Sequence, residues 1–152
     1  MSTIKLHATT PATPEQYTAA LTGFGPGRSK IFGNSADSYL KVHGEGPGHA
    51  DVTEGSGGVW ERLAYDWTDP NHVVARTTDS NIWGGRSGHD YRYTRTSGGT
   101  TEIDYVVVRQ GKNFKGHFLG FVLGTVGRSK LTKAFASSVK AVEARANPAP
   151  KA

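Results

Sequence analysis

The sequence contains no cysteine and a single methionine. The absence of cysteine excludes disulfide bonds, thiolate nucleophiles and thiolate metal ligands, and it leaves the redox state of the compartment open. A chain of 152 residues fits one domain and can bury about 68–70% of its unfolded-chain surface. We therefore expect one domain that needs no covalent or metal cross-link to fold.

Long hydrophobic runs are also absent. The longest apolar block, residues 118–126, contains two glycines and Thr125 and is about half of the roughly 20 residues that a membrane-spanning helix requires. After Met1 the chain continues as a mixed run, and no basic segment leads into an apolar stretch, so no secretory signal is visible. We expect a cytoplasmic protein.

Acidic residues are scarce toward the C-terminal end. Residues 110–152 hold eight Lys or Arg against the single Glu143, whereas residues 1–109 hold ten against twelve acidic residues. The simplest interpretation is a solvated basic face on an amphipathic helix. A second is transient docking on an anionic membrane surface. A third is nucleic acid, which we do not expect because no recognition motif or exposed aromatic platform accompanies the charge.

Motifs for metals, phosphates and nucleophiles are missing. His43 and His49 fall on adjacent predicted strands, but no third ligand has a recognisable spacing, so we expect no metal and no cofactor. The Gly-Arg-Ser-Lys sequence at 27–30 and again at 127–130 lacks the order of a phosphate-binding loop. Ser87 lacks the second framing glycine of a nucleophile elbow. No catalytic triad can be assembled from these residues.

The N-terminal residues change from a strand pattern to a helix pattern. Apolar and polar residues alternate over residues 4–8, which predicts a strand with one apolar face. Thr13 is a good N-cap, and Gln16 follows it in capping-box spacing, so a helix is predicted over residues 14–21. The glycines around position 25 end it, and a second short helix is expected over about 28–32.

Short alternating runs separated by Gly, Pro, Asn and Asp then predict a meander of antiparallel strands. The predicted strands lie near 38–43, 49–54, 59–67, 72–79, 89–95 and 101–109. After Gly111 the apolar residues recur every three or four positions up to Val142, with one gap at Gly124 and Gly127. This pattern predicts two helical pieces or one helix bent near Gly127, and residues 147–152 are expected to form a disordered tail.

The predicted order is one strand, two short helices, six strands and a long helix, and four motifs follow one another in that order. They are Thr13-Pro14-Glu15-Gln16-Tyr17, Val52-Thr53-Glu54-Gly55, Trp67-Thr68-Asp69-Pro70 and Val139-Lys140-Ala141-Val142-Glu143. In order and motifs, residues 3–146 resemble the START-like superfamily, also called the helix-grip or SRPBCC fold. The resemblance is to its polyketide cyclase/dehydrase and lipid transport branch, particularly small actinobacterial members.

The resemblance implies an α+β fold, in which a curved antiparallel sheet of six to seven strands wraps on a long C-terminal helix. It also implies one ligand-binding domain over residues 3–146, with a pocket for lipids, polyketides or other hydrophobic molecules. Catalysis occurs in only some of the relatives. Twisted strands packed on one helix can leave a cavity between the two layers.

The inward face of strand 59–67 supplies the first candidate site residues. Glu61 alternates in step with Leu63 and Tyr65 and therefore lies on the more apolar face. Burial of a carboxylate is costly, so we expect a raised pKa and a protonated Glu61 that donates a hydrogen bond to a ligand. The alternatives are a position at the rim or a structural pair with an arginine. Arg76 is one candidate partner, although a surface position suits it better.

Further candidates come from strand 89–95, one loop and the C-terminal helix. His89, Tyr91 and Tyr93 share a face, as pocket lining or as ordinary core. Trp83 is either a lid residue or hydrophobic cover. The helix residues expected to line the pocket are Phe118, Val122 and Phe135.

The expected function is binding of a hydrophobic ligand such as a lipid, fatty acid or polyketide, with transport of that ligand as an extension of it. Burial of about 16 methylenes contributes roughly 13 kcal/mol against an association cost of about 4–15 kcal/mol. The alternative is a polyketide cyclase/dehydratase-like enzyme in which Glu61 or His89 is the general acid or base. A third hypothesis is a regulatory or partner-binding protein that uses its C-terminal helix as the contact surface. Binding is favoured over catalysis because the sequence contains no nucleophile motif and no set of metal ligands with a recognisable spacing.

Overall fold

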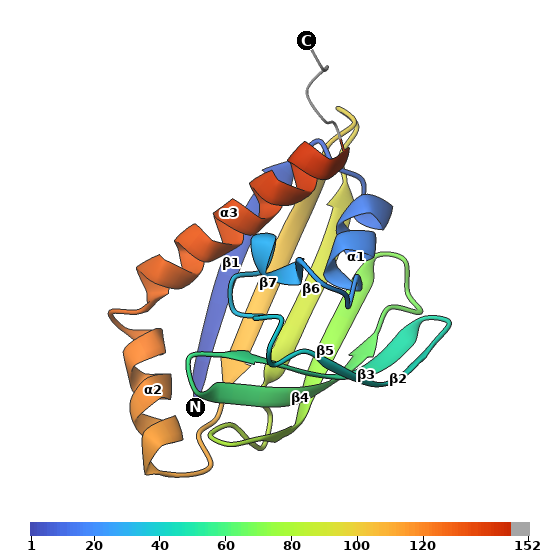
Figure 1. The fold of residues 1–152 in the computed structure, drawn as a ribbon. Coiled ribbons are helices and arrows are strands. Elements are labelled where there is room, and N and C mark those ends of the chain that lie inside the picture. The colour runs from blue at the N-terminus through green and yellow to red at the C-terminus, as the bar shows by residue number, and fades with distance from the viewer. Residues whose placement is uncertain (147–152) are drawn as a thin grey trace.

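Residues that alternate in polarity form a seven-stranded antiparallel sheet in the computed structural model, which describes residues 1–146 (Figure 1). The predicted tail at 147–152 lies outside the described residues. The strands are β1 (Ser2–Thr10), β2 (Lys41–Gly46), β3 (His49–Ser56), β4 (Val59–Asp66), β5 (His72–Ser80), β6 (Gly88–Arg95) and β7 (Thr101–Arg109). The helices are α1 (Pro14–Leu21), the single-turn η1 (Arg28–Lys30), α2 (Phe114–Gly124) and α3 (Arg128–Ala146).

The strands follow the order β1-β7-β6-β5-β4-β3-β2 across the sheet. Six of them form the predicted meander of sequential neighbours, and β1 pairs with β7 along its whole length, from Ser2 opposite Arg109 to Thr10 opposite Thr101. The β4–β5 register shifts between Arg62 and Leu63. Such an irregularity increases the local twist and bends the sheet, which produces the concave face toward the helices.

Helix α1 begins at the predicted capping box. The Gln16 amide donates to the Thr13 hydroxyl at 3.1 Å, and the Thr13 amide donates to the Gln16 side chain at 2.9 Å. Two amide donors of the first turn are thereby satisfied. Tyr17 and Leu21 then turn their side chains into the core, where they are almost completely buried.

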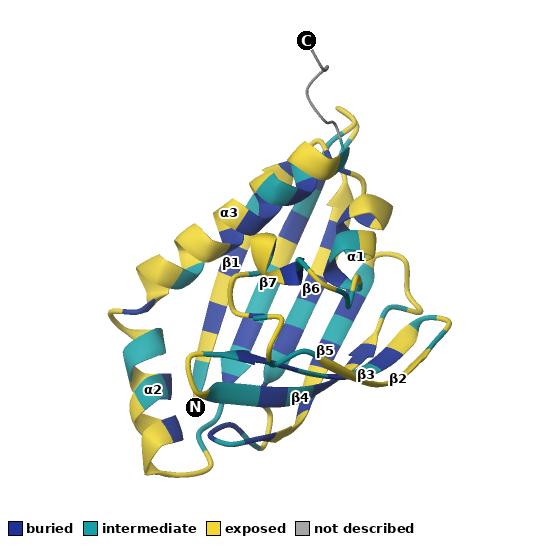
Figure 2. Cartoon of the chain, in the orientation of Figure 1, coloured by how far each residue is buried: buried dark blue, intermediate teal, exposed yellow. Residues whose placement is uncertain are grey.

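Helix α3 crosses the concave face of the sheet (Figure 1) and buries one stripe of side chains against it (Figure 2). The buried residues of this helix are Phe135, Ser138, Val139 and Val142. Opposite them lie fully buried sheet residues such as Ile4, Val73 and Ile103. The predicted α+β helix-grip architecture is confirmed.

The predicted gap in the helical pattern separates α2 from α3 at residues 125–127. Helix α2 packs through Gly116 and Gly120, whereas Phe114, Phe118 and Phe121 are 87%, 59% and 68% exposed. A side chain at Gly116 would overlap the backbone carbonyl of Ile82, so only glycine allows the helix to lie this close. Within residues 1–146, no helix is long and apolar enough to span a membrane.

Candidate functional site

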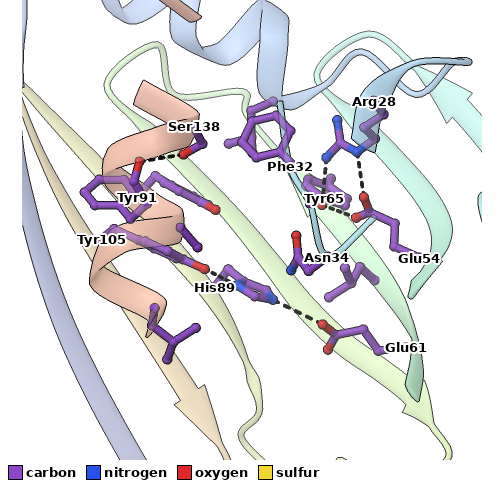
Figure 3. A pocket seen from close by; sticks show the side chains of 16 residues that line it. Arg28, Phe32, Asn34, Glu54, Glu61, Tyr65, His89, Tyr91, Tyr105 and Ser138 are labelled. Atoms are coloured by element: carbon purple, nitrogen blue, oxygen red, sulfur yellow. Dashed lines mark hydrogen bonds and ion pairs between the residues drawn. The ribbon is translucent and has the colours of Figure 1, made fainter. Parts of the chain in front are cut away.

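Two adjoining chambers of about 200 and 300 Å³ lie between the sheet and the helices. We call them the α3 chamber, which Phe135 and Ser138 line, and the α2 chamber, which Val122 and Leu123 line. They share the lining residues Asn34, Glu54, Glu61, His89, Tyr105 and Leu131. Figure 3 shows the α3 chamber, with His89 between Tyr105 and Glu61, and Arg28 beside Glu54 and Tyr65.

Glu61 forms a buried ion pair with Arg109 at the wall of the α2 chamber. Arg109 Nη1 donates to Glu61 Oε2 at 2.8 Å, and Nη2 donates to Oε1 at 2.9 Å. Thr77 Oγ1 donates to Oε2 at 2.9 Å, and His89 Nε2 lies 3.2 Å from Oε1. The carboxylate therefore has a polar partner on both oxygens, which is the condition for keeping a charge inside a protein.

The ion pair reverses the pKa shift expected for Glu61. Burial by itself raises the pKa, but the Arg109 charge and the hydrogen bonds from His89 and Arg109 outweigh it and hold the pKa well below its ordinary value. The prediction of a raised pKa and a protonated, hydrogen-bond-donating Glu61 is wrong. Of the alternatives, a structural pair with an arginine is the one that forms, and the arginine is Arg109 rather than Arg76, which is exposed.

His89 connects the Glu61–Arg109 pair to a stack of tyrosine rings. Its Nδ1 lies 2.6 Å from the hydroxyl oxygen of Tyr105, and its Nε2 lies 3.1 Å from Arg109 Nη2. The Tyr105 ring stacks on Tyr91 with centroids 4.2 Å apart and planes 6° apart. Burial raises the pKa of Tyr105 to about 12, so the phenol stays protonated at neutral pH.

A second buried ion pair, between Arg28 and Glu54, lies at the far side of the α3 chamber (Figure 3). Arg28 Nε donates to Glu54 Oε1 at 2.6 Å, and Ser35 Oγ donates to the same oxygen at 2.7 Å. The Tyr65 hydroxyl donates to the other oxygen of Glu54. Burial raises the pKa of the Tyr65 phenol well above its ordinary value, so this hydroxyl remains a donor.

Most of the predicted site residues line the cavity. Glu61, Leu63, Tyr65, His89, Tyr91 and Phe135 line the α3 chamber, and Trp83 and Val122 line the α2 chamber. Tyr93 is buried but lies outside both chambers, where its hydroxyl accepts a hydrogen bond from Thr18 at 3.0 Å. Phe118 is exposed because the glycine face of α2 occupies the inner side of that helix. Whether the lining residues contact a ligand stays a prediction.

The sequence reasoning missed Arg28, Glu54, Tyr105 and Arg109. A signal was available for three of them, because Glu54 alternates in step with Val52 on β3, and Tyr105 and Arg109 alternate in step with Val107 on β7. Among the strands, only β4 and β6 supplied predicted site residues. Arg28 lies on η1, a short element without a periodicity of its own, and no comparable signal exists for it.

Metal ligands do not cluster in the part of the chain that the structure describes. Within residues 1–146 no group of three or more His, Asp or Glu side chains is arranged to hold a metal ion. The two histidines considered above have different hydrogen-bond partners. His43 contacts the Thr53 hydroxyl at 2.7 Å, and His49 contacts the carbonyl of Pro47 at 3.0 Å.

No protein-family model matches the sequence, and no curated protein matches it as a relative. Solved structures match it over nearly the whole chain. A START superfamily protein from Mycobacterium smegmatis is 11% identical, with a TM-score of 0.68 over 93% of this chain and 99% of the other. The Zhui aromatase/cyclase from a Streptomyces species is 15% identical, with a TM-score of 0.68 over 99% of this chain and 98% of the other.

Half of a larger protein matches as well. The di-domain aromatase/cyclase StfQ of the steffimycin biosynthetic pathway is 11% identical, with a TM-score of 0.64 over 93% of this chain and 45% of the other. The chain therefore has the START-like fold, as the sequence resemblance implied. Identities this low show the shared fold and carry no activity or ligand with them.

Proposed function

We propose that this START-like chain binds a compact hydrophobic molecule that carries polar groups, and that the molecule occupies the two chambers between the sheet and helices α2 and α3. The observation that supports this proposal most directly is the composition of the walls. Apolar and aromatic side chains surround both chambers, and one buried Arg–Glu pair lies in the wall of each. Ligand pockets are typically apolar with a few convergent polar groups.

The apolar part of the wall supplies the affinity. Leu63, Leu131 and Phe135 line the α3 chamber, and the Tyr91 ring lies beside them in the stack with Tyr105. Burial of apolar ligand surface here contributes about 25 cal/mol per Å² before the cost of association. The flat face of a stacked tyrosine pair suits an aromatic ring, because offset aromatic stacking adds to the burial.

The polar part of the wall selects neutral polar groups rather than a net charge. Each guanidinium faces its own carboxylate, so Arg28 and Arg109 add no uncompensated charge to the walls. The Tyr65 and Tyr105 hydroxyls add protonated phenols on either side of the α3 chamber. Carbonyl and hydroxyl groups of a polyketide-like molecule match these groups, whereas a saturated acyl chain uses none of them.

The size of the cavity also favours a compact ligand. Of the two chambers, the one of about 200 Å³ lies below the roughly 300–1,000 Å³ typical of ligand pockets, and the one of about 300 Å³ lies at its lower limit. The exposed Asn34 lines both chambers, so their junction opens toward solvent at this residue. Two of the structures that share this fold are named aromatase/cyclases, and an aromatic probe is therefore a suitable first test of binding.

A second candidate function is catalysis on the same ligand. The contact between His89 and the Tyr105 hydroxyl at 2.6 Å lies in the wall that both chambers share, and it supports a proposal that these two groups act as an acid–base pair. Glu61 is held in its ion pair, so its role in such an enzyme is to position His89 rather than to donate a proton. This chemistry suits a cyclisation or dehydration.

Binding is tested with 1-naphthol as a defined aromatic probe and with native mass spectrometry of the freshly purified protein. Leu131→Trp fills the junction of the two chambers from a half-buried helix position. Ala136→Trp adds the same ring at an exposed position of the same helix and is the control. We expect 1-naphthol binding by the parent and by the control, and a loss of about tenfold or more in affinity for Leu131→Trp.

Two outcomes contradict the proposal. The first is equal affinity of the parent, Leu131→Trp and Ala136→Trp for 1-naphthol, because the probe then binds outside the chambers. The second is tight binding of palmitate with no binding of 1-naphthol and no aromatic molecule in the native mass spectrum. That result assigns the cavity to an acyl chain.

A further inference from the structure

Helix α2 exposes three phenylalanines, which a core helix would bury. Phe114, Phe118 and Phe121 follow at intervals of four and three residues and therefore share one face. All three side chains are more than half exposed, and Val126 just beyond the helix is 78% exposed. Figure 2 shows α2 at the end of the sheet with exposed residues on its outer side and buried ones toward the protein.

The closest contacts of α2 with the rest of the protein are made by two glycines, Gly116 and Gly120. Gly116 lies against the carbonyl of Ile82, and a Cβ at Gly120 would come 3.6 Å from the Trp83 ring. Ser2 Oγ donates to the carbonyl of Gly120 at 2.7 Å and ties the helix to β1. A helix normally buries its large apolar residues and exposes small or polar ones. The close approach at the two glycines fixes the orientation of α2, so Phe114, Phe118 and Phe121 on the opposite side project outward.

The chain segment that carries this aromatic face is basic. No Asp or Glu occurs between residues 110 and 142, whereas that segment holds six Lys or Arg. Lys115 on α2 and Arg128 and Lys130 at the start of α3 are exposed. Within residues 1–146, Lys112 is the one basic residue of this segment that forms a salt bridge, with its Nζ 3.5 Å from Asp79 Oδ1. Projecting phenylalanines with exposed cations on the same helix and at the start of the next one suit a bilayer, which has an apolar interior and can carry an anionic surface.

We propose that this aromatic face, formed by Phe114, Phe118, Phe121 and Val126, docks the protein on an anionic lipid bilayer. A short helix with aromatic residues on one side and Lys or Arg beside them lies in the interface, with its apolar side about 5–10 Å deep. Each basic residue near an anionic leaflet adds about 1 kcal/mol. A bilayer accepts projecting rings without a matching shape, whereas a protein partner needs pockets for three separate phenylalanines.

The docking surface and the cavity meet at the same helix. Leu119, Val122 and Leu123 on the inner side of α2 line the α2 chamber, so the wall of that chamber lies one helix thickness from the bilayer. An apolar molecule dissolved in the membrane then has a short path into the cavity. Docking itself does not depend on what the chambers bind, and vesicle binding is measured separately from 1-naphthol binding.

The test is flotation of the full chain with phosphatidylcholine vesicles and with vesicles containing about 30% phosphatidylserine. We expect binding to the anionic vesicles that weakens as salt is raised. The triple variant Phe114→Ser/Phe118→Ser/Phe121→Ser removes the apolar side and should lower this binding about tenfold or more. Lys115→Glu/Lys130→Glu should lower it about tenfold on anionic vesicles.

The controls use exposed positions on other elements. Val42→Ser on β2 and Lys5→Glu on β1 replace one exposed apolar and one exposed basic residue away from α2 and should leave vesicle binding unchanged. The substituted phenylalanines lie on the surface, so unchanged circular dichroism and 1-naphthol binding are expected for the triple variant. The proposal is overturned if the parent protein fails to float with anionic vesicles. It is also overturned if the parent is a dimer that the triple variant converts to a monomer, because a second copy then covers this face.

Discussion

Glu61 and Arg109, which are 48 positions apart in the chain, face each other as a two-point ion pair inside the protein. Both N···O distances are below 3.0 Å, and the two side chains are 11% and 9% exposed. Glu61 projects from β4 and Arg109 from the end of β7, on the same concave face of the sheet. The pair therefore links two strands that share no backbone hydrogen bonds.

Arg109→Met should destabilise the protein by about 3–5 kcal/mol, because it leaves the Glu61 carboxylate buried without its charge partner. Urea unfolding at neutral pH measures the loss. The double variant Glu61→Leu/Arg109→Met removes both charges and should recover much of that stability, since apolar replacements of a whole buried pair are often neutral. If Arg109→Met is as stable as the parent, the Glu61–Arg109 ion pair does not stabilise the fold.

The depressed pKa of Glu61 predicts an acid-sensitive fold. The folded-state pKa lies below the ordinary value of 4.5, so between the two values the unfolded chain binds more protons. The contribution of Glu61 is then fully present above about pH 5 and is lost as the pH falls toward the folded pKa. Unfolding free energies measured between neutral pH and pH 3 should fall less steeply for Glu61→Gln than for the parent.

Two features make that experiment specific. Glu61→Gln should be less stable than the parent at neutral pH, because Arg109 then lacks its counter-charge. Its unfolding free energy should nevertheless fall less steeply as the pH is lowered. Glu45→Gln, at an exposed position of β2, also removes one carboxylate, and its unfolding free energy should fall with pH as steeply as that of the parent. If the unfolding free energies of all three proteins fall equally steeply with pH, the acid sensitivity belongs to other groups.

The glycine face of α2 predicts opposite effects for two alanine substitutions. Gly116→Ala should destabilise by about 1–3 kcal/mol, because the new Cβ overlaps the Ile82 carbonyl. Gly120→Ala meets only ordinary contacts, 3.6 Å from Trp83 and 3.8 Å from the Arg109 carbonyl, and should stabilise by about 0.5–1 kcal/mol. Thermal unfolding compares them, and equal effects would refute the close packing at Gly116.

His89→Gln separates a binding protein from an enzyme. For a binding protein we expect a graded change in 1-naphthol affinity of at most a few kcal/mol, the contribution of one hydrogen bond to a charged group. For an enzyme, turnover should fall about 10²–10⁴-fold with affinity nearly level. The assay incubates aromatic polyketide thioester analogues with each protein and analyses the products by mass spectrometry.

His72→Gln is the matched control for this substitution. His72 lies on β5 and contacts Asp90 at 2.9 Å, and it lines neither chamber. We expect no product from the parent protein beyond what the buffer yields. Product formation that His89→Gln abolishes and His72→Gln retains would replace the binding proposal with the catalytic one.

Local sequence patterns determined the elements of this protein and which face of each strand is buried. The alternation in β1, β4 and β6 matches the observed burial, and the Thr13–Gln16 capping box begins α1 where it was predicted. The break near Gly127 appears as the separation of α2 from α3. These features depend on neighbours within a few residues, because side-chain direction in a strand or helix follows from the backbone period.

Only the tertiary structure decided which buried groups meet. The alternation places Glu61 and Arg109 on inward faces, but their contact depends on the curvature of the sheet and on the pairing of β4, β5, β6 and β7. The sign of the Glu61 pKa shift followed from that contact, since burial and a nearby guanidinium act in opposite directions. Likewise, the period of α2 places the phenylalanines and glycines on separate faces, and the approach of the Ile82 backbone decides that the glycines face inward.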